Sequence, residues 1–226
     1  MKYMTIKTLS FIFLAFLIYS CSDESKQAKV NTTDIDKLSN TTISITKGNY
    51  KVVDAKAKEL TKSQNHIYLK ADYLSDETNL IRRKLSESCI LNPDQPNRIK
   101  KIAEDLHSKE GNIKAEFYDE YNNLSSVLYS DSAIISNRNN NMTAYGNVVI
   151  YSPTTNFMLL SDQIKWENQA KRISSLEEDV SNVTVIKIIE ENKKSCVQKS
   201  EGFESDMDLS NYIFIKPKGK ISEDCF

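Results

Sequence analysis

Few side chains in this sequence have the types and spacing that catalysis requires. Only two histidines are present, His66 and His107, and neither lies in the motif of a serine hydrolase or a zinc site. The sequence has no Gly-x-Ser-x-Gly elbow, phosphate-binding loop, His-Glu-x-x-His motif or dinucleotide fingerprint. Its 31 acidic residues supply so many carboxylate pairs that no single pair indicates glycosidase chemistry. We therefore expect no enzyme activity, no cofactor and no metal.

Cys21 is the residue whose setting points to a defined chemical modification. An apolar run from Leu9 to Tyr19 follows two lysines and is shorter than the roughly 20 residues that span a bilayer. The segment Leu17–Cys21 has an apolar residue three positions before the cysteine and a small residue directly before it. It resembles the lipobox of bacterial lipoproteins, in which the cysteine is acylated. We expect residues 1–20 to be a lipoprotein signal peptide; the alternatives are a plain signal peptide or an uncleaved anchor helix.

The lipobox resemblance implies a periplasmic protein held to a membrane by two or three acyl chains on Cys21. Ser22 follows the cysteine, and the first acid comes at Asp23. Because Asp directly after the cysteine is the familiar inner-membrane retention signal, these residues leave the choice of membrane open, and we expect the inner membrane. The polar composition after Cys21 predicts a flexible tether over residues 21–42.

Three further cysteines remain, at positions 89, 196 and 225. The expected compartment permits disulfides, but an odd number leaves at least one thiol unpaired in a monomer. We expect Cys196 to pair with Cys225, since both lie in the C-terminal strand region. Three unpaired thiols are the alternative.

Composition sets further limits on the function. The net charge of −1 over 226 residues gives no electrostatic reason to expect a nucleic-acid partner. The alternating acids Glu204, Asp206 and Asp208 resemble part of a calcium loop, but the glycine and bidentate glutamate of an EF-hand are missing. A solvated turn is therefore favoured there.

The elements that would position a site are short strands between Phe117 and Val185. Turn-rich residues at 137–141, 152–154 and 167–170 separate pieces of typical strand length. Ser130-Asp131 and Ser161-Asp162 each open such a piece, and the two aspartates are 31 residues apart. This spacing suits a repeated unit of two to three strands.

Within these strands, one set of alternate positions is mostly apolar. A bulge is expected at Asp162–Gln163, where the alternation is interrupted. The pattern predicts an antiparallel sheet with one apolar face, which must meet another sheet, itself or an apolar ligand. The positions expected to face away include Tyr145, Asn147, Tyr151 and Lys165. The apolar set includes Leu128, Met142, Val148, Ile150, Leu159, Ile164, Trp166 and Ile173.

Residues 76–110 follow a different pattern. Apolar residues at 99, 102, 103 and 106 have the spacing of one helical face. We interpret this stretch as an insertion with one or two short amphipathic helices that dock on the parent domain.

Several short segments resemble, in order and spacing, the LptC family, the periplasmic bridge component of lipopolysaccharide export, and especially its lipoprotein-anchored branch. The likeness is close over residues 113–220 and loose over 43–74. The matching segments are Phe117–Asp119, Leu128–Asp131 with Ala133, Gly146–Val149, Leu159–Asp162 with Ile164 and Trp166, Ile173, Gly202–Asp206, Leu209, Tyr212 and Lys216–Gly219.

The resemblance implies an all-β fold, a twisted open antiparallel β-jelly roll over residues 43–222, with the short helical insertion around 76–110. It also implies a function: to take lipopolysaccharide or a related glycolipid from an inner-membrane ABC transporter and pass it to the next periplasmic bridge protein toward the outer membrane. The eight apolar positions above become candidate acyl-lining residues, and exposed strand edges would pair with neighbouring jelly rolls.

Two competing functions make different structural predictions. An envelope scaffold lipoprotein without lipid carriage predicts the same strands closed over a packed core. A cell-wall hydrolase or sugar-binding lipoprotein predicts a polar cleft lined by paired carboxylates. Lipid carriage predicts an apolar groove open at the strand edges.

Overall fold

The computed structural model describes residues 37–71, 113–175, 182–189 and 194–219. These residues form twelve β-strands in one antiparallel sheet and contain no helix. The predicted all-β antiparallel jelly roll is confirmed. The predicted helical insertion at 76–110 and the signal peptide lie outside the described residues. The first strand begins at Lys37, inside the range expected for the tether. The strands are β1 (Lys37–Lys47), β2 (Tyr50–Lys62), β3 (His66–Lys70), β4 (Ile113–Tyr118), β5 (Leu124–Ser130), β6 (Ser132–Ser136), β7 (Met142–Ser152), β8 (Phe157–Glu167), β9 (Arg172–Ser174), β10 (Val183–Ile189), β11 (Lys194–Asp206) and β12 (Tyr212–Lys218).

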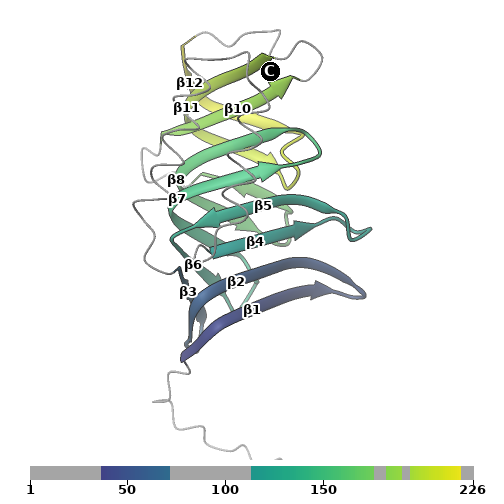
Figure 1. The fold of residues 1–226 in the computed structure, drawn as a ribbon, viewed down its shortest axis with the longest axis vertical. Coiled ribbons are helices and arrows are strands. Elements are labelled where there is room, and N and C mark those ends of the chain that lie inside the picture. The colour runs from purple at the N-terminus through teal and green to yellow at the C-terminus, as the bar shows by residue number, and fades with distance from the viewer. Residues whose placement is uncertain (1–36, 72–112, 176–181, 190–193, 220–226) are drawn as a thin grey trace, which may run out of the picture. The chain divides into compact units, whose positions relative to one another are not determined.

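Long strands that change partners fold the sheet into two layers (Figure 1). In β2, Val53–Lys56 pair with β4, whereas Glu59–Lys62 pair with β3. In β8, Phe157–Leu160 pair with β10, and Lys165–Glu167 pair with β9. The strands β7 and β11 change partners in the same way. We call β4, β5, β10 and the adjoining parts of the long strands the front layer, and β3, β6, β9 and the remaining parts the back layer.

The two ends of the strand stack are the edge strands β1 and β12 (Figure 1). β1 pairs only with β2, and β12 pairs only with β11. Each of these strands therefore leaves the backbone groups of its outer edge unpaired within the described sheet.

Asparagine shapes three of the tight turns between strands. Asn122, Asn140 and Asn156 have φ values of 63°, 57° and 54° and lie in the β4–β5, β6–β7 and β7–β8 turns. Asparagine tolerates this left-handed conformation better than most residues. Asparagine thus occupies a left-handed position in each of these three hairpin turns.

Buried serines lie where the chain passes from the front layer to the back layer. Ser130, Ser161 and Ser200 are each 0% exposed. Each hydroxyl donates to a carbonyl two residues further along, so a local bond satisfies the acceptor at the bend. The Ser-Asp repeat in the sequence marks two of these bends, and Ser200-Glu201 marks a third. The three bonds are Ser130 to Ser132 (3.1 Å), Ser161 to Gln163 (3.0 Å) and Ser200 to Gly202 (2.8 Å).

The bulge expected at Asp162–Gln163 of β8 lies on the partner strand β7 instead. The register shifts between Tyr145 and Val148, opposite Asp162. Gly146 and Asn147 carry it on the β7 side, with φ values of 75° and 49°. A Cβ on Gly146 would lie 2.6 Å from Asp131 Oδ2, so the close approach requires glycine.

Apolar side chains from both layers fill the space between them. This interior cluster includes residues of β1–β9, β10, β11 and the β11–β12 turn, nearly all less than about a tenth exposed. The buried Ile113, Ala115 and Phe117 of β4 alternate with half-buried positions, as period-two patterning requires.

A second apolar cluster lies on the opposite face of the front layer. Its residues come from β5, β7, β8 and β10 and are 0–3% exposed. The prediction of a single apolar face is therefore wrong for these strands. Continuous apolar runs such as Phe157–Leu160 indicate strands buried on both faces. The members of this outer cluster are Val127, Tyr129, Val149, Met158, Leu160, Ile186 and Ile188.

Candidate functional site

All the candidate acyl-lining residues lie in the interior cluster, at 0–1% exposure. The front layer supplies Leu128, Val148, Ile150 and Leu159, and the back layer supplies Met142, Ile164, Trp166 and Ile173. Strand pairing places Ile150 directly beside Leu159, and Trp166 beside Ile173. The structure thus brings the two halves of the set together across the layers, with their own side chains filling the interior.

Phe117 and Trp166 make an aromatic contact between the layers. Their ring centroids are 5.2 Å apart at 59°, with Phe117 on β4 in front and Trp166 on β8 behind. Both side chains are fully buried. Trp166 Nε1 is buried without a hydrogen-bond partner.

A second aromatic group closes the interior beside β12. Phe157, Phe203, Tyr212 and Phe214 form ring contacts with centroids 5.0–6.2 Å apart. The interior positions of Phe157 and Phe203 were not predicted from the sequence. The alternation of Tyr212 and Phe214 on one strand was the available signal.

A surface pocket of about 690 Å³ lies where the interior meets solvent, and we call it the mouth. Residues of the β4–β5, β7–β8, β8–β9 and β11–β12 turns line it. Tyr118 in its wall directly follows the buried Phe117. Met207 belongs both to the pocket wall and to the interior cluster. The mouth therefore borders the interior, between turns of the front and back layers.

The β11–β12 turn crosses the mouth from the back layer and is bonded to the front layer. Ser126 Oγ donates to the Met207 carbonyl at 2.6 Å, and Thr155 Oγ1 donates to the Asp208 carbonyl at 3.0 Å. Leu209 of this turn is 0% exposed and has a φ of 62°, which is rare for leucine. The turn thus holds an apolar side chain in the interior with a strained backbone.

The acids of this turn serve its own geometry. The Asp206 carboxylate accepts bonds from Ser210 Oγ (3.0 Å) and Asn211 Nδ2 (2.6 Å). Burial opposes ionisation of Asp206, but hydrogen bonds from Asp208, Asn211 and Ser210 outweigh it and lower its pKa. Burial and the hydrogen bond with Asp206 raise the pKa of Asp208. Glu204 pairs with Arg172 at 3.0 Å.

These contacts are those of a structured turn whose acids bond within it. Among the residues that the structure describes, no group of three or more His, Cys, Asp or Glu is placed to hold a metal ion. Asp119 on the opposite rim likewise accepts bonds within its own turn, from the Tyr121 and Asn123 amides at 2.8 Å each.

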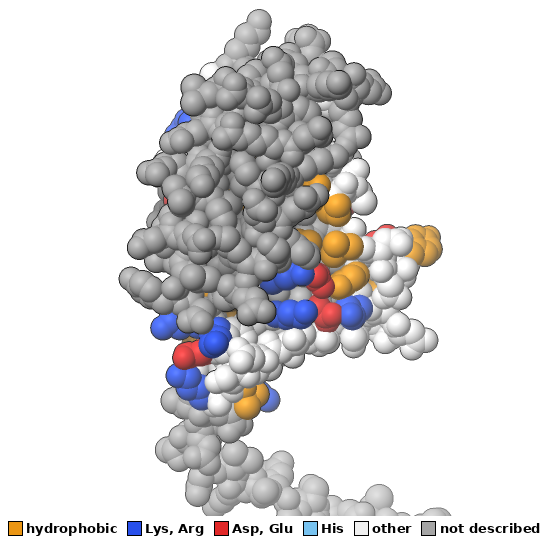
Figure 2. Space-filling model, viewed as in Figure 1, with side chains coloured by type: hydrophobic (Ala, Val, Ile, Leu, Met, Phe, Trp, Pro, Cys, Tyr) orange, Lys and Arg blue, Asp and Glu red, His pale blue; other side chains and the backbone are white. Residues whose placement is uncertain are grey.

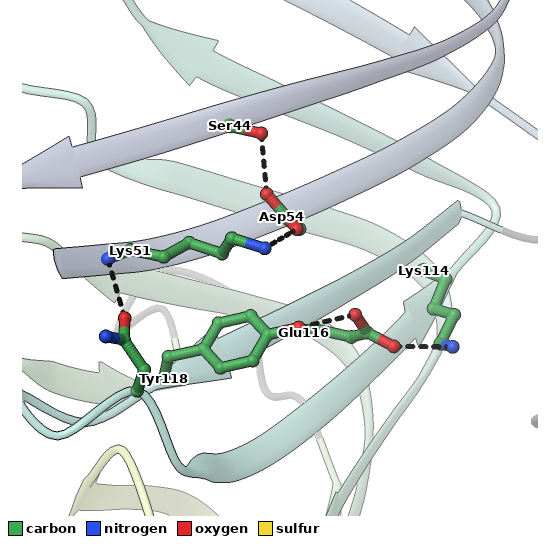
Figure 3. A network of polar contacts seen from close by, with 7 residues as sticks. Ser44, Lys51, Asp54, Lys114, Glu116 and Tyr118 are labelled. Atoms are coloured by element: carbon green, nitrogen blue, oxygen red, sulfur yellow. Dashed lines mark hydrogen bonds and ion pairs between the residues drawn. The ribbon is translucent and has the colours of Figure 1, made fainter.

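The outer face of the front layer is polar over β1, β2 and β4. Asp54 accepts bonds from Ser44 Oγ and Lys51 Nζ, both at 2.6 Å (Figure 3). Figure 2 shows Lys and acidic side chains together over this region. Burial opposes ionisation of Asp54, but these bonds and the Lys51 and Lys56 charges lower its pKa. We call this group, with Lys114, Glu116 and Tyr118, the polar network.

Glu116 is the second carboxylate of the polar network. It pairs with Lys114 at 2.6 Å and accepts a bond from the Tyr118 hydroxyl at 2.8 Å (Figure 3). Burial opposes its ionisation, but these two bonds lower its pKa. Burial and the bond to Glu116 raise the pKa of Tyr118 to about 12.

The two edge strands differ in character. On β12, Ile213 is 58% and Ile215 36% exposed, so the edge presents apolar side chains. Pro217 and a positive φ of 48° at Lys216 interrupt its regular geometry. On β1, Leu38 is the one large apolar side chain that is strongly exposed among the described residues of the strand, at 51%.

The expected modification and disulfide fall largely outside the described residues. Cys196 lies on β11, 4% exposed, and is disulfide-bonded. Its expected partner Cys225 and the expected lipidation residue Cys21 are not described, so both expectations stay predictions. The described residues include no helix long and apolar enough to cross a membrane.

Comparisons with known proteins identify no family for this chain. No protein-family model matches the sequence, and no curated protein sequence is significantly similar to it. The resemblance to LptC therefore rests on the short segments of this sequence alone.

Proposed function

We propose that this protein is an envelope lipoprotein that carries glycolipid by sheltering its acyl chains between the two layers of its jelly roll. It takes lipopolysaccharide or a related glycolipid from an inner-membrane ABC transporter and passes it to the next bridge protein. It is held in the periplasm by acylated Cys21, at the inner membrane. It needs no catalytic group for this task.

The observation that carries the proposal is the single interior cluster. The eight acyl-lining candidates come from both layers and meet in one apolar interior that reaches the mouth at Met207. An acyl chain gains roughly 0.8 kcal/mol for each buried CH₂. A chain of about twelve carbons thus gains on the order of 10 kcal/mol before the cost of opening the interior is subtracted. No specific polar contact is needed to hold such a chain.

Entry requires the layers to part, because the interior is filled by its own side chains. We place this opening at the mouth, because the interior cluster borders the surface pocket there. Two side-chain bonds, from Ser126 and Thr155, join the β11–β12 turn to the front layer there. Releasing them would free Met207 and Leu209 from the interior, and the strain at Leu209 would be relieved. The sugar would stay in water at the polar rim.

The edge strands β1 and β12 are where neighbouring jelly rolls bind. β1 and β12 lie at opposite ends of the stack, and each has one unpaired edge within the described sheet. An edge strand of a similar jelly roll can add to either by β-augmentation. The exposed Ile213 and Ile215 make β12 the edge with more apolar area to bury.

The second candidate function is a scaffold that binds other envelope proteins and no lipid. The filled interior favours it, because a packed core is what a scaffold needs. The interior has the packed core predicted for the scaffold and not the open groove predicted for lipid carriage. Because both functions use the edge strands, lipid occupancy is the measurement that decides between them.

Photocrosslinking in cells tests the proposal. A diazirine amino acid replaces Leu159 or Trp166 in the interior, or Met207 at the mouth. Lys165, whose side chain pairs with Glu167 at 2.5 Å on the other face, is the control position. Lipid carriage predicts glycolipid adducts at the interior and mouth positions and none at Lys165. Protein adducts alone, or no adducts at any position, would favour the scaffold, and equal lipid adducts at Lys165 would show that the interior is not the lipid site.

A further inference from the structure

The indole N–H of Trp166 is an exception among the buried polar groups. It is the one buried side-chain nitrogen or oxygen in the described residues that lacks a hydrogen-bond partner. Buried hydroxyls nearby are bonded; Ser126, for example, donates to the Met207 carbonyl. A buried donor without an acceptor is unfavourable, and each such group in a folded protein calls for an explanation.

Packing alone does not require an indole at this position. The neighbours of Trp166 in strand register are Met142 and Ile173, and Phe117 contacts it from the front layer. All belong to the apolar cluster. A phenyl ring would bury apolar area there without leaving a donor unsatisfied. Indole nitrogen can only donate, so the missing partner must be an acceptor.

The position of Trp166 along the interior places it toward the mouth. Trp166 is the next-to-last residue of β8, before the β8–β9 turn whose Lys171 lines the mouth. Its contact residue Phe117 is the next-to-last residue of β4, before the turn that supplies the opposite wall. The donor thus lies at the end of the interior nearest the pocket.

We propose that the Trp166 N–H donates to the carbonyl oxygen of the ester or amide that joins an acyl chain to its headgroup. This inference rests on the proposed function. The linkage carbonyl is the hydrogen-bond acceptor that joins the acyl chain to the headgroup. When the headgroup lies in the mouth and the chain lies in the interior, this carbonyl lies at the end of the interior where Trp166 is found. The bond fixes how far the chain enters and distinguishes acyl from alkyl lipids.

A pair of matched lipids tests the bond. Lauroyl lysophosphatidylcholine has an ester carbonyl, and dodecyl lysophosphatidylcholine has an ether in its place. Calorimetric titration of the full chain below the micelle concentrations gives both Kd values. We expect the ester to bind about fivefold tighter to the native protein, the effect of one ordinary hydrogen bond. For Trp166→Phe, which keeps an aromatic ring and removes the donor, we expect equal Kd values.

The native protein offers a second measurement that needs no substitution. Trp166 is its one tryptophan, so the indole ¹⁵N–¹H resonance is assigned without ambiguity. The ester lipid should shift the indole proton downfield, and the ether lipid should not. A merely structural role for Trp166 predicts the same shift with both lipids.

The outcomes separate this inference from the function on which it rests. If both lipids bind the native protein equally and shift the indole alike, the donor serves another acceptor, such as buried water, and the inference fails while lipid carriage stands. If Trp166→Phe keeps the preference for the ester, the inference also fails. If neither lipid binds, the proposed function and the inference fail together.

Discussion

Over β5, β7, β8 and β10 both faces of the front layer are apolar, yet only the inner face fits the proposed lipid carriage. Leu159 and Met158 are neighbours on β8, and both are 0% exposed. Leu159 belongs to the interior cluster and Met158 to the outer cluster. The interior cluster joins two layers, borders the mouth and contains the unpartnered N–H donor of Trp166. The outer cluster is confined to one layer. The comparison teaches that burial alone does not distinguish the two clusters; the proposed function assigns lipid to the interior cluster because it lies between two layers and beside the mouth.

The outer face of the front layer changes from polar to apolar across the sheet. Along one row of paired residues, Glu116 of the polar network lies opposite Val127 of the outer cluster. Along the next, Lys114 lies opposite Tyr129. Burial, and then the nearby Glu116 charge, raise the pKa of Tyr129. The boundary between the polar and apolar halves of this face therefore runs between β4 and β5.

Alanine at the two neighbouring positions gives the sharpest test of the comparison. Leu159→Ala and Met158→Ala should each lower the free energy of unfolding by roughly 2–5 kcal/mol, because each leaves a cavity in a packed cluster. Urea titration followed by circular dichroism measures both. Only Leu159→Ala should also change the affinity for acyl lipid. Equal changes in lipid affinity would remove the distinction between the faces.

The bulge that separates the layers should tolerate no side chain at Gly146. Gly146→Ala should cost roughly 2–3 kcal/mol, since the positive φ and the contact with Asp131 both oppose a Cβ. Gly48→Ala is the matched control, with φ 62° and nothing within 4 Å of the added Cβ. It should cost about 1 kcal/mol. Thermal denaturation compares the two, and equal losses would show that the Asp131 contact is unimportant.

The buried serines at the bends should matter more than surface serines. Ser161→Ala leaves the Gln163 carbonyl without its side-chain donor and should cost roughly 1–2 kcal/mol. Ser39→Ala, on the exposed part of β1, should change stability by less than about 0.5 kcal/mol. Chemical denaturation of both variants checks this, and a neutral Ser161→Ala would mean that the bend needs no such bond.

The polar network predicts the smallest effect, visible as a pH dependence. The folded-state pKa values of Asp54 and Glu116 are lowered, so their contribution to stability is full above about pH 4–5 and is lost as the pH falls through the lowered values. Asp54→Asn should cost up to about 1 kcal/mol at pH 7 and nothing near pH 2. Urea midpoints at the two pH values measure this; a pH-independent loss would contradict the assignment.

Local patterns predicted part of the architecture. Alternation placed the acyl-lining candidates on one face, and Ser130-Asp131 and Ser161-Asp162 marked two of the bends. The outer cluster was not predicted, because a period-two pattern assigns apolar residues to one buried face only. In the continuous apolar run Phe157–Leu160, alternate residues are buried on opposite faces of the strand.

The parts of the site that depend on distant contacts could not be predicted. The contact between Phe117 and Trp166 requires strands of two layers to face each other. The mouth gathers turns that are far apart in the sequence, and the turn that places Leu209 in the interior is bonded to the distant Ser126 and Thr155. No spacing in the chain encodes such proximities; strand register and layer closure create them.

The central claim is that the layers part at the mouth to admit acyl chains, and a distance measurement tests it most directly. Spin labels introduced as unnatural amino acids replace Tyr121 on the front-layer rim and Ala170 on the back-layer β8–β9 turn. A second pair, Arg138 and Ala170, lies on back-layer turns alone and is the control. We expect glycolipid to lengthen the Tyr121–Ala170 distance and leave the control distance unchanged. Glycolipid binding with both distances unchanged would contradict the account.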